Sequence, residues 1–211
     1  MGGAAVLVVA LVVWFMVWEQ GEKQVAAGEA LSQVSASHFT PGPHPGAAEA
    51  YLKVAAAYPS SDAGARALLL AAGTLFSEGK YDDAKAQFQK FVREHSDSPF
   101  LGQALLGIAS CLDAQGNADA AGAYKDLVDH HSGDVAVPQA KFALARLYEA
   151  QNKPDLAHTL YEDVEHTDPY GMFGPEAGMR AAELEIKFPN LAAKPATPPA
   201  APAPTLKLQN K

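Results

Sequence analysis

The chain has 211 residues, a formal net charge of −8 and a single cysteine, Cys111. This length allows one ordinary domain of about 100–150 residues together with additional segments. The acidic balance, without a cluster of Lys and Arg, disfavours nucleic acid as a partner. One cysteine excludes both an intramolecular disulfide and a cysteine zinc cluster. Abundant alanine and few β-branched runs after the N-terminus predict an all-α fold.

The N-terminal segment is an apolar run without one charge, from Ala4 to Trp18. As a helix these residues rise about 22 Å, so flanking residues must complete the ~30 Å hydrocarbon core of a bilayer. Trp14 and Trp18 suit the membrane interface. We therefore expect a single transmembrane helix over residues 1–20. A cleaved signal peptide is the alternative, but nothing basic precedes the run. The abrupt start also leads us to expect a longer, basic N-terminus in the natural protein.

Residues 21–45 are expected to form a juxtamembrane helix and a linker. The membrane helix is expected to continue as a polar helix to about Ser35. The stretch "HFTPGPHPG" that follows is rich in Pro and Gly, which is typical of a loop.

A motif repeats from residue 46 onward. The stretch "GKYDDAKAQFQKFV" at 79–92 is echoed by "GNADAAGAYKDLV" at 116–128 and by "NKPDLAHTLYEDV" at 152–164. Each copy has a small residue, an aromatic residue four positions later and an apolar residue three positions after that, with spacings of 36 and 37 between copies. These residues are Ala84, Ala120 and Ala157; Phe88, Tyr124 and Tyr161; and Phe91, Leu127 and Val164. An earlier half copy has Ala47, Tyr51 and Val54. Such a period indicates stacked helical units.

A second set of helices lies between these segments, in the same period. It is marked by Ala72, Ala109 and Ala145 and by Leu75, Leu112 and Tyr148. Small residues let two antiparallel helices approach closely, so each pair should form a hairpin. Gly79, Gly116 and Asn152 stand at the turns, where a left-handed cap is expected. One hairpin cannot bury its own apolar face, so neighbours must stack into a solenoid.

The pattern resembles the tetratricopeptide repeat over residues 46–188, although it lacks the early tryptophan and exceeds the usual ~34-residue period. The expected domain has a half hairpin at about 46–58, three full hairpins, and a capping helix at about 174–187. An N-terminal span without a lipobox cysteine makes the chain most similar to the ancillary SecYEG translocon subunit (YfgM-like) family. That resemblance implies a bacterial inner-membrane protein, single-pass, with its repeat domain in the periplasm.

The C-terminal stretch, residues 189–211, holds six prolines and few apolar anchors. It is predicted to be a disordered Pro- and Ala-rich tail.

The sequence contains no motif for catalysis. It lacks a Gly-rich phosphate loop, a serine elbow and zinc-type cysteine spacing, so we expect no enzyme activity and no cofactor. Cys111 is interpreted as a buried packing thiol, and Phe88 and Phe91 as core residues. His158, Glu162 and His166 fall on one helix face and could hold a metal, but we interpret them as a solvated face with His near the helix C-terminus, and predict no metal site.

Function is therefore expected on the first helix of each hairpin, which usually lines the concave face of such solenoids. The predicted partner-binding groove takes the side away from Ala72, Leu75 and their equivalents. Its residues are Arg66, Phe76, Gln103, Asp113, Arg146 and Glu149. A partner peptide or helix would bind with the aromatic residue as anchor and the arginines as orienting charges.

Three functional hypotheses follow. The first is a membrane-tethered scaffold for protein–protein interactions, with translocon subunits or emerging envelope proteins as partners implied by the resemblance. The second is a scaffold for cell-wall synthesis or cell division, with the proline-rich tail as a spacer or docking segment. The third is an exported soluble repeat protein whose apolar run is cleaved. The residues do not separate the first two, because both require only an anchor and a groove.

Overall fold

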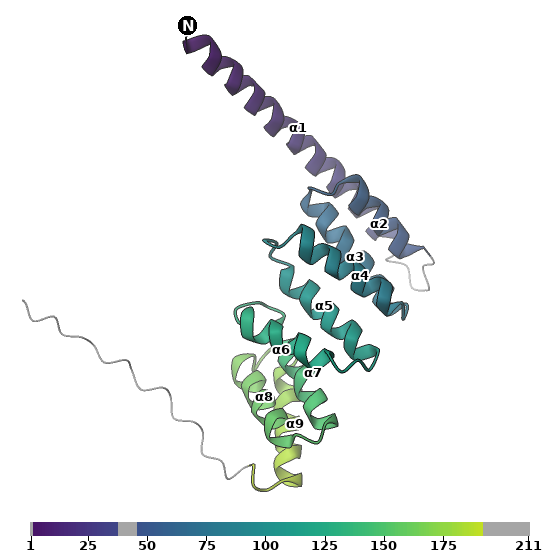
Figure 1. Cartoon of the computed structure of the whole chain (residues 1–211), viewed down its shortest axis with the longest axis vertical. Helices are drawn as coiled ribbons and strands as arrows, with labels where there is room; N and C mark the ends of the chain where they lie inside the picture. The colour runs from purple at the N-terminus through teal and green to yellow at the C-terminus, as the bar shows by residue number, and fades with distance from the viewer. Residues whose placement is uncertain (1, 38–45, 192–211) are drawn as a thin grey trace, which may run out of the picture. The chain divides into compact units, whose positions relative to one another are not determined.

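The computed structural model describes residues 2–37 and 46–191, with the backbone alone for residues 2–13 and 15–17. Within this part the chain forms nine helices and no strand, which confirms the all-α prediction (Figure 1). The helices are α1 (Gly2–Ser37), α2 (Ala47–Ala57), α3 (Asp62–Ser77), α4 (Tyr81–Glu94), α5 (Leu101–Ala114), α6 (Ala120–His130), α7 (Val137–Ala150), α8 (Pro154–Thr167) and α9 (Gly174–Lys187). The bounds of α2 and α9 agree with the expected half hairpin and capping helix.

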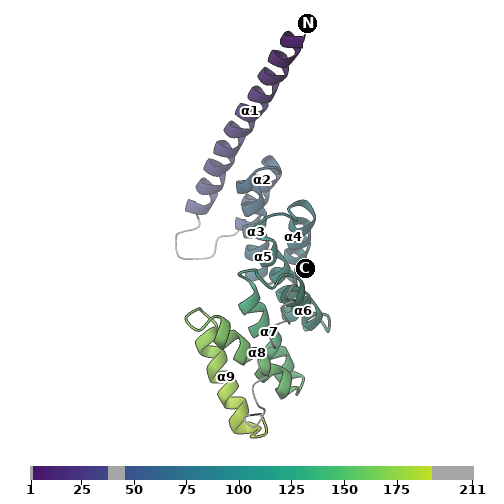
Figure 2. The same ribbon diagram turned by 90° about the vertical axis from the view of Figure 1, so that its left-hand side faces the viewer.

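The helices divide into two compact units, residues 1–144 and residues 145–211. In the first unit α2 to α6 pack consecutively, each against the next helix in the chain, as Figure 1 shows. In the second unit α8 packs against α9, and Figure 2 shows these two helices side by side. Consecutive packing of helices is the arrangement that a repeat solenoid predicts.

Helix α1 runs without interruption from the apolar run into the expected juxtamembrane helix. Its C-terminal part packs against α2 and α3, where Ala27 is fully buried and Leu31 and Val34 contact the core. Gln24 accepts a hydrogen bond from the backbone N–H of Asp62 at the start of α3, over 3.3 Å. The C-terminal half of α1 therefore belongs to the first unit.

The expected transmembrane helix falls mostly on residues whose side chains lie outside the description. Trp14 and Trp18 are described: both are exposed, and their rings stack with centroids 6.4 Å apart. Among the described residues, no helix has the length and apolar character needed to cross a membrane. The linker segment 38–45 and most of the predicted tail, residues 192–211, lie outside the described residues.

The core of the first unit follows the repeat. Phe91 and Ala84 are fully buried and Phe88 is 8% exposed, which confirms their assignment as core residues. Cys111 is also fully buried, as expected of a packing thiol. Burial raises the pKa of this thiol to about 11, with a smaller raising effect from Asp82 and a lowering effect from Lys85.

The three hairpin turns are closed in the same way. Gly79, Gly116 and Asn152 have left-handed backbones with φ of +75°, +65° and +56°, as predicted. In each turn the next residue donates its backbone N–H to a carbonyl five positions earlier, over 2.9 Å. These bonds join Lys80 to Leu75, Asn117 to Leu112 and Lys153 to Tyr148. Identical turns show that the period seen in the sequence is a period of structure.

The second unit buries the same repeat positions. Ala157, Tyr161 and Val164 of α8 are fully buried. On α9 the buried residues lie on one face, at Ala177, Ala181 and Leu184. Because these positions are four and three residues apart, they form one stripe directed at α8.

Candidate functional site

Three of the six predicted groove residues are exposed. Arg66 on α3 and Gln103 on α5 lie in the first unit, and Arg146 on α7 lies in the second. The Arg66 guanidinium carbon lies 5.9 Å from the centroid of the Phe100 ring, a cation–π contact that holds the side chain at the surface. Arg66 and Gln103 occupy the same repeat position, 37 residues apart.

The other three predicted groove residues face inward, toward the second helix of their own hairpin. The ring of Phe76 contacts that of Tyr81 with centroids 5.2 Å apart. Asp113 accepts a long hydrogen bond of 3.5 Å from the Tyr124 hydroxyl.

Glu149 completes the series, because it accepts a 2.6 Å hydrogen bond from the Tyr161 hydroxyl. Phe76, Asp113 and Glu149 are all half-buried, so the expected outward orientation is wrong for them. The physical reason is their spacing: each follows the small residue of its helix by four positions, which is about one turn and therefore the same face.

Tyr161 is fully buried, more deeply than Tyr124 and Tyr81 of the equivalent contacts. Burial is the main cause that raises the pKa of Tyr161, and the hydrogen bond to Glu149 raises it further. The neutral hydroxyl is thus retained as a donor, which ties α8 to α7 within the second unit.

A shallow pocket of about 380 Å³ lies between α5 and α6 in the first unit. Its walls combine apolar residues with two histidines and one carboxylate: Leu105, Ile108, Ala123, Asp126, Leu127, His130 and His131. A ring nitrogen of His130 lies 3.1 Å from the backbone carbonyl of Asp126. The pocket can accept an apolar side chain beside polar groups. Sequence reasoning missed it, although Leu105 and Ile108 share one face of α5.

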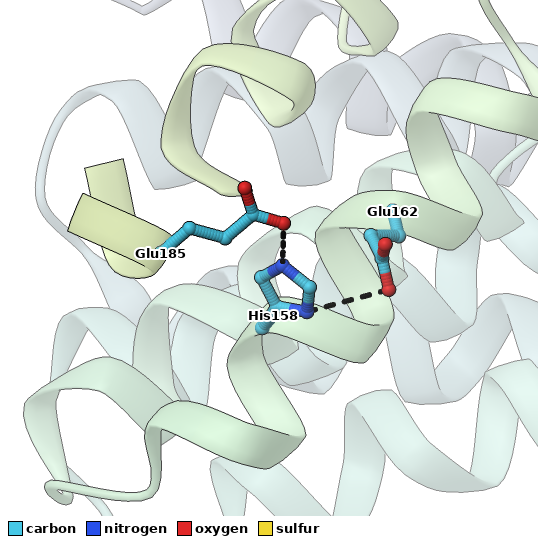
Figure 3. Close-up of side chains that lie close together, drawn as sticks. All are labelled: His158, Glu162 and Glu185. Carbon is cyan, nitrogen blue, oxygen red and sulfur yellow. Dashed lines mark hydrogen bonds and ion pairs between the residues drawn. The ribbon is translucent and has the colours of Figure 1, made fainter. Parts of the chain in front are cut away.

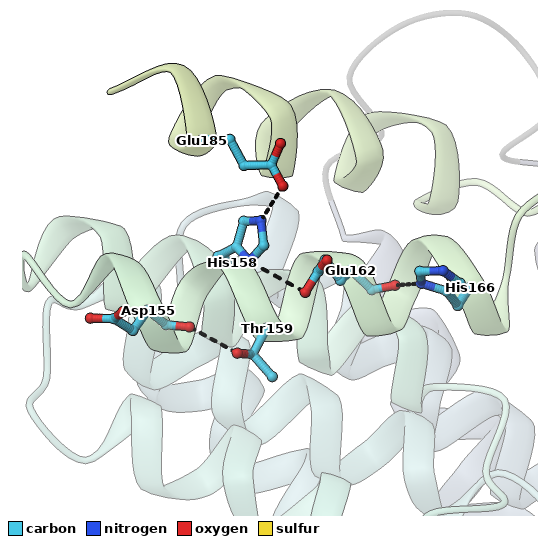
Figure 4. A network of polar contacts seen from close by, with 6 residues as sticks. All are labelled: Asp155, His158, Thr159, Glu162, His166 and Glu185. Carbon is cyan, nitrogen blue, oxygen red and sulfur yellow. Dashed lines mark hydrogen bonds and ion pairs between the residues drawn. The ribbon is translucent and has the colours of Figure 1, made fainter. Parts of the chain in front are cut away.

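A polar cluster joins α8 to α9 in the second unit (Figure 3). His158 is only 6% exposed, and its Nε2 lies 3.0 Å from Oε1 of Glu185. Its Nδ1 lies 3.3 Å from Oε2 of Glu162 on the same helix. Of the predicted trio, His166 is not part of the cluster: its Nδ1 contacts the Glu162 backbone carbonyl at 2.6 Å, as Figure 4 shows.

The interpretation of His158 as part of a solvated face is therefore wrong. His158 lies beside the buried Ala157 at the edge of the α8–α9 contact, where it meets Glu185 of α9. The repeat pattern contains a signal that could have identified Glu185 as the partner of His158. Glu185 lies 37 residues after Tyr148, at a position held by apolar or aromatic residues in the earlier copies. A carboxylate there requires a polar partner.

The cluster can hold two helices together more readily than it can hold an ion. The ligand atoms of His158, Glu162 and Glu185 lie within 4.8 Å of one another. However, the two carboxylates approach opposite ring nitrogens, whereas one metal ion would need them to converge on the same nitrogen (Figure 3). The ring supplies one N–H donor when neutral and two when charged, so it bridges α8 to α9.

Comparisons with known proteins agree with this architecture. The crystal structure of MamA protein superposes with a TM-score of 0.54 at 19% sequence identity, covering 84% of this chain and 98% of that chain. This likeness shows a shared fold. No curated protein matches the sequence. A fold of this kind is typical of scaffolds that bind other proteins without catalysing a reaction. A family model, described as tetratricopeptide repeat-like domain, matches residues 1–163, and the chain therefore belongs to that family.

Proposed function

We propose that this protein is a membrane-tethered scaffold that binds segments of other proteins along the first helices of its hairpins. The observation that carries the proposal is the row of exposed polar side chains, Arg66 and Gln103, at one repeat position of successive first helices. Leu70, one turn after Arg66, is 43% exposed and adds an apolar contact beside the charge. Solenoids form extended binding surfaces from exposed side chains at equivalent positions of successive repeats.

The binding strip is thus defined as Arg66, Leu70 and Gln103. It replaces the six-residue groove in the first unit, because Phe76 and Asp113 contact their own hairpins. A bound segment would place an acidic residue at Arg66 and an apolar residue at Leu70. The pocket between α5 and α6 is a separate surface of the same unit.

The tether is the apolar run Ala4–Trp18, supported by the absence of any charge within it and by the exposed rings of Trp14 and Trp18. We place the anchor in a bacterial inner membrane with the repeats in the periplasm, as the resemblance to the ancillary translocon subunit implies. A tether raises the effective concentration of the strip for other membrane complexes. Translocon subunits and emerging envelope proteins are the partners of this proposal, with chaperone-like support as the role.

The strip is tested by crosslinking in cells. A photoreactive amino acid at position 66 or 103 should capture partners, whereas one at Gln89, which is exposed on the second helix α4, should not. Partners are then identified by mass spectrometry. Equal capture from all three positions would contradict a strip on the first helices. Recovery of cell-wall enzymes or division proteins in place of translocon subunits would favour the scaffold for envelope growth.

A charge reversal gives a matched control. Arg66→Glu should reduce recovery of the partner in pull-downs, while Arg93→Glu, an exposed arginine of α4, should leave it unchanged. Each substitution lowers the net charge by the same two units, so a general charge effect would appear in both variants.

The tether is tested independently. Protease added to spheroplasts should cleave the repeat domain if it lies in the periplasm, and mass spectrometry should find the apolar run in the mature chain. A protected repeat domain would overturn the topology. A mature chain that begins after Trp18 would instead support an exported soluble protein.

A further inference from the structure

Helix α9 has an exposed apolar stripe on the face opposite to α8. Met179 is 63% exposed and Ile186 is 83% exposed, with the exposed Ala182 between them. The spacing of three and four residues aligns these side chains along one face of the helix. The buried stripe of Ala177, Ala181 and Leu184 points the other way.

The repeat shows that this face is normally covered. The earlier residues equivalent to Ala182 are fully or almost fully buried: Ala72, Ala109 and Ala145. Those equivalent to Met179 include Leu106 and Phe142, which are 9% and 7% exposed. Those equivalent to Ile186 are Phe76, Asp113 and Glu149, and each contacts an aromatic side chain of a second helix. Within the described residues α9 has no second helix, so its stripe lacks the partner that every earlier copy has.

The charged residues beside the stripe indicate which kind of helix could pack against it. Glu176, Arg180, Glu183 and Lys187 form one edge, with signs that alternate along the helix. From the N-terminal to the C-terminal end these charges read negative, positive, negative, positive, and in the opposite direction they read positive, negative, positive, negative. When two copies of the helix lie antiparallel, each charge on this edge therefore faces one of opposite sign. Arg180 makes two long ion pairs with exposed carboxylates of its own helix, 3.9 Å to Glu176 and 3.8 Å to Glu183. Such pairs contribute little and can be exchanged for pairs with another chain.

We propose that α9 is a dimerisation surface whose partner is the α9 helix of a second copy of this chain, packed antiparallel about a two-fold axis beside Ala182. Met179 lies three residues before Ala182 and Ile186 four residues after it, so Met179 meets Ile186 of the partner subunit. On the charged edge Glu176 meets Lys187 of the partner subunit, and Arg180 meets Glu183 of the partner subunit. Each contact occurs twice, as a two-fold interface requires.

Ala182 at the crossing point lets the two backbones approach closely. On the other edge Glu185 would lie opposite Gly178 of the partner subunit, so no like charges meet there, and Glu185 keeps its contact with His158. One helix from each chain makes an interface smaller than the ~1,200–2,000 Å² of stable complexes, so the dimer is concentration-dependent. The proposal is independent of what binds to Arg66, Leu70 and Gln103.

Disulfide trapping in the full chain tests the geometry, in a Cys111→Ala background that removes the native thiol. Ala182→Cys should form a covalent dimer on mild oxidation, because the two-fold axis brings this position next to itself. Glu176→Cys should not crosslink to itself, since antiparallel pairing separates the two copies by about 18 Å. A mixture of Glu176→Cys and Lys187→Cys chains should give the mixed dimer.

Sedimentation of the full chain in detergent, from about 1 to 100 μM, tests the charges. Glu176→Lys or Lys187→Glu alone should weaken self-association about three- to tenfold, and the double exchange should restore it. Circular dichroism verifies that each variant stays helical. A chain that remains monomeric and fails to trap at Ala182 would overturn the proposal. So would self-crosslinking of Glu176→Cys, which indicates parallel pairing, or loss of the dimer on removal of residues 192–211, which indicates the tail as partner.

Discussion

The α4–α5 contact in the first unit and the α8–α9 contact in the second are the same element of the repeat, built from different chemistry. At α4–α5 the Phe88 ring lies so close to Gly107 that a Cβ added there would approach it to 2.5 Å. At α8–α9 His158 bridges two carboxylates. The residue of α4 that corresponds to His158 is Lys85, whose side chain is 25% exposed and pairs with the exposed Asp82.

The same arrangement of two helices from neighbouring hairpins therefore accepts either an apolar contact, such as Phe88 against Gly107, or a polar contact, such as His158 between two carboxylates. The apolar contact gains its stability from burial, which is insensitive to the state of single protons. The polar contact depends on every partner being present, because a buried ring nitrogen without a partner costs free energy. The α8–α9 contact should therefore be the one that a substitution of a polar side chain weakens.

The largest effect is expected at the apolar contact. Phe88→Ala should lower the free energy of unfolding by about 3–5 kcal/mol, as a large core truncation. Chemical denaturation followed by circular dichroism measures the loss, and Phe88→Leu serves as the milder control. Hydrogen exchange should show faster opening in α4 and α5, since repeats depend mainly on their neighbours. A loss below about 1 kcal/mol would contradict this apolar contact.

The contacts of His158 should contribute less to the free energy of unfolding than the contact of Phe88. His158→Ala removes both contacts at once and should cost about 1–3 kcal/mol. The increase in hydrogen exchange should be confined to α8 and α9. Glu162→Gln, which retains a side chain of the same shape at the exposed end of the bridge, is the control and should cost less than His158→Ala. If zinc raised the melting temperature of the native protein but not of His158→Ala, the cluster would be a metal site after all.

Cys111 lies in the same core as Phe88 and adds a pH dependence to the stability of the first unit. Its pKa is about 11 in the folded chain against 9.0 as reference, so the thiol of the unfolded chain ionises first. The free energy of unfolding should therefore fall as the pH rises from about 9 to 11. Unfolding midpoints over this range test it, with Cys111→Ala as the variant in which this part of the decline disappears. An identical decline in both proteins would assign the alkaline effect to other groups.

The smallest effect is expected at Lys85. Lys85→Met should change the free energy of unfolding by no more than about 0.5 kcal/mol, because its partner Asp82 is solvated. The same substitution removes a charge that lowers the pKa of Cys111, so the reaction of this thiol with a disulfide reagent should shift to higher pH. A large loss of stability would show that Lys85 acts as a buried bridge like His158.

The sequence predicted those features that recur. The spacing of Ala84, Ala120 and Ala157 was sufficient to place the helices, and the residues at the three turns have the left-handed backbones expected of them. The repeat period predicts these features well because each copy makes the same contacts. A residue pattern that occurs by chance in one copy does not recur in the others.

The candidate site was predicted less well, for two physical reasons. Phe76 was assigned to the outer face although it follows Ala72 by one helical turn, and so points into the hairpin. The partner of His158 lies on another helix, 27 residues away, and only the fold brings Glu185 to it. The open stripe of α9 likewise emerges only when its exposure is compared with that of the earlier copies.

If the apolar run is inserted in a membrane as proposed, helix α1 fixes the distance between the first hairpins and the bilayer. Its residues from Glu19 to Ala26 separate the end of the apolar run from Ala27, the first residue buried in the repeats. Eight residues of helix rise about 12 Å. The first hairpins would then lie close to the lipid headgroups, because α1 is one continuous helix from Gly2 to Ser37. Partners with short segments emerging from the bilayer would then reach Arg66 and Leu70, whereas bulky domains held farther out would not.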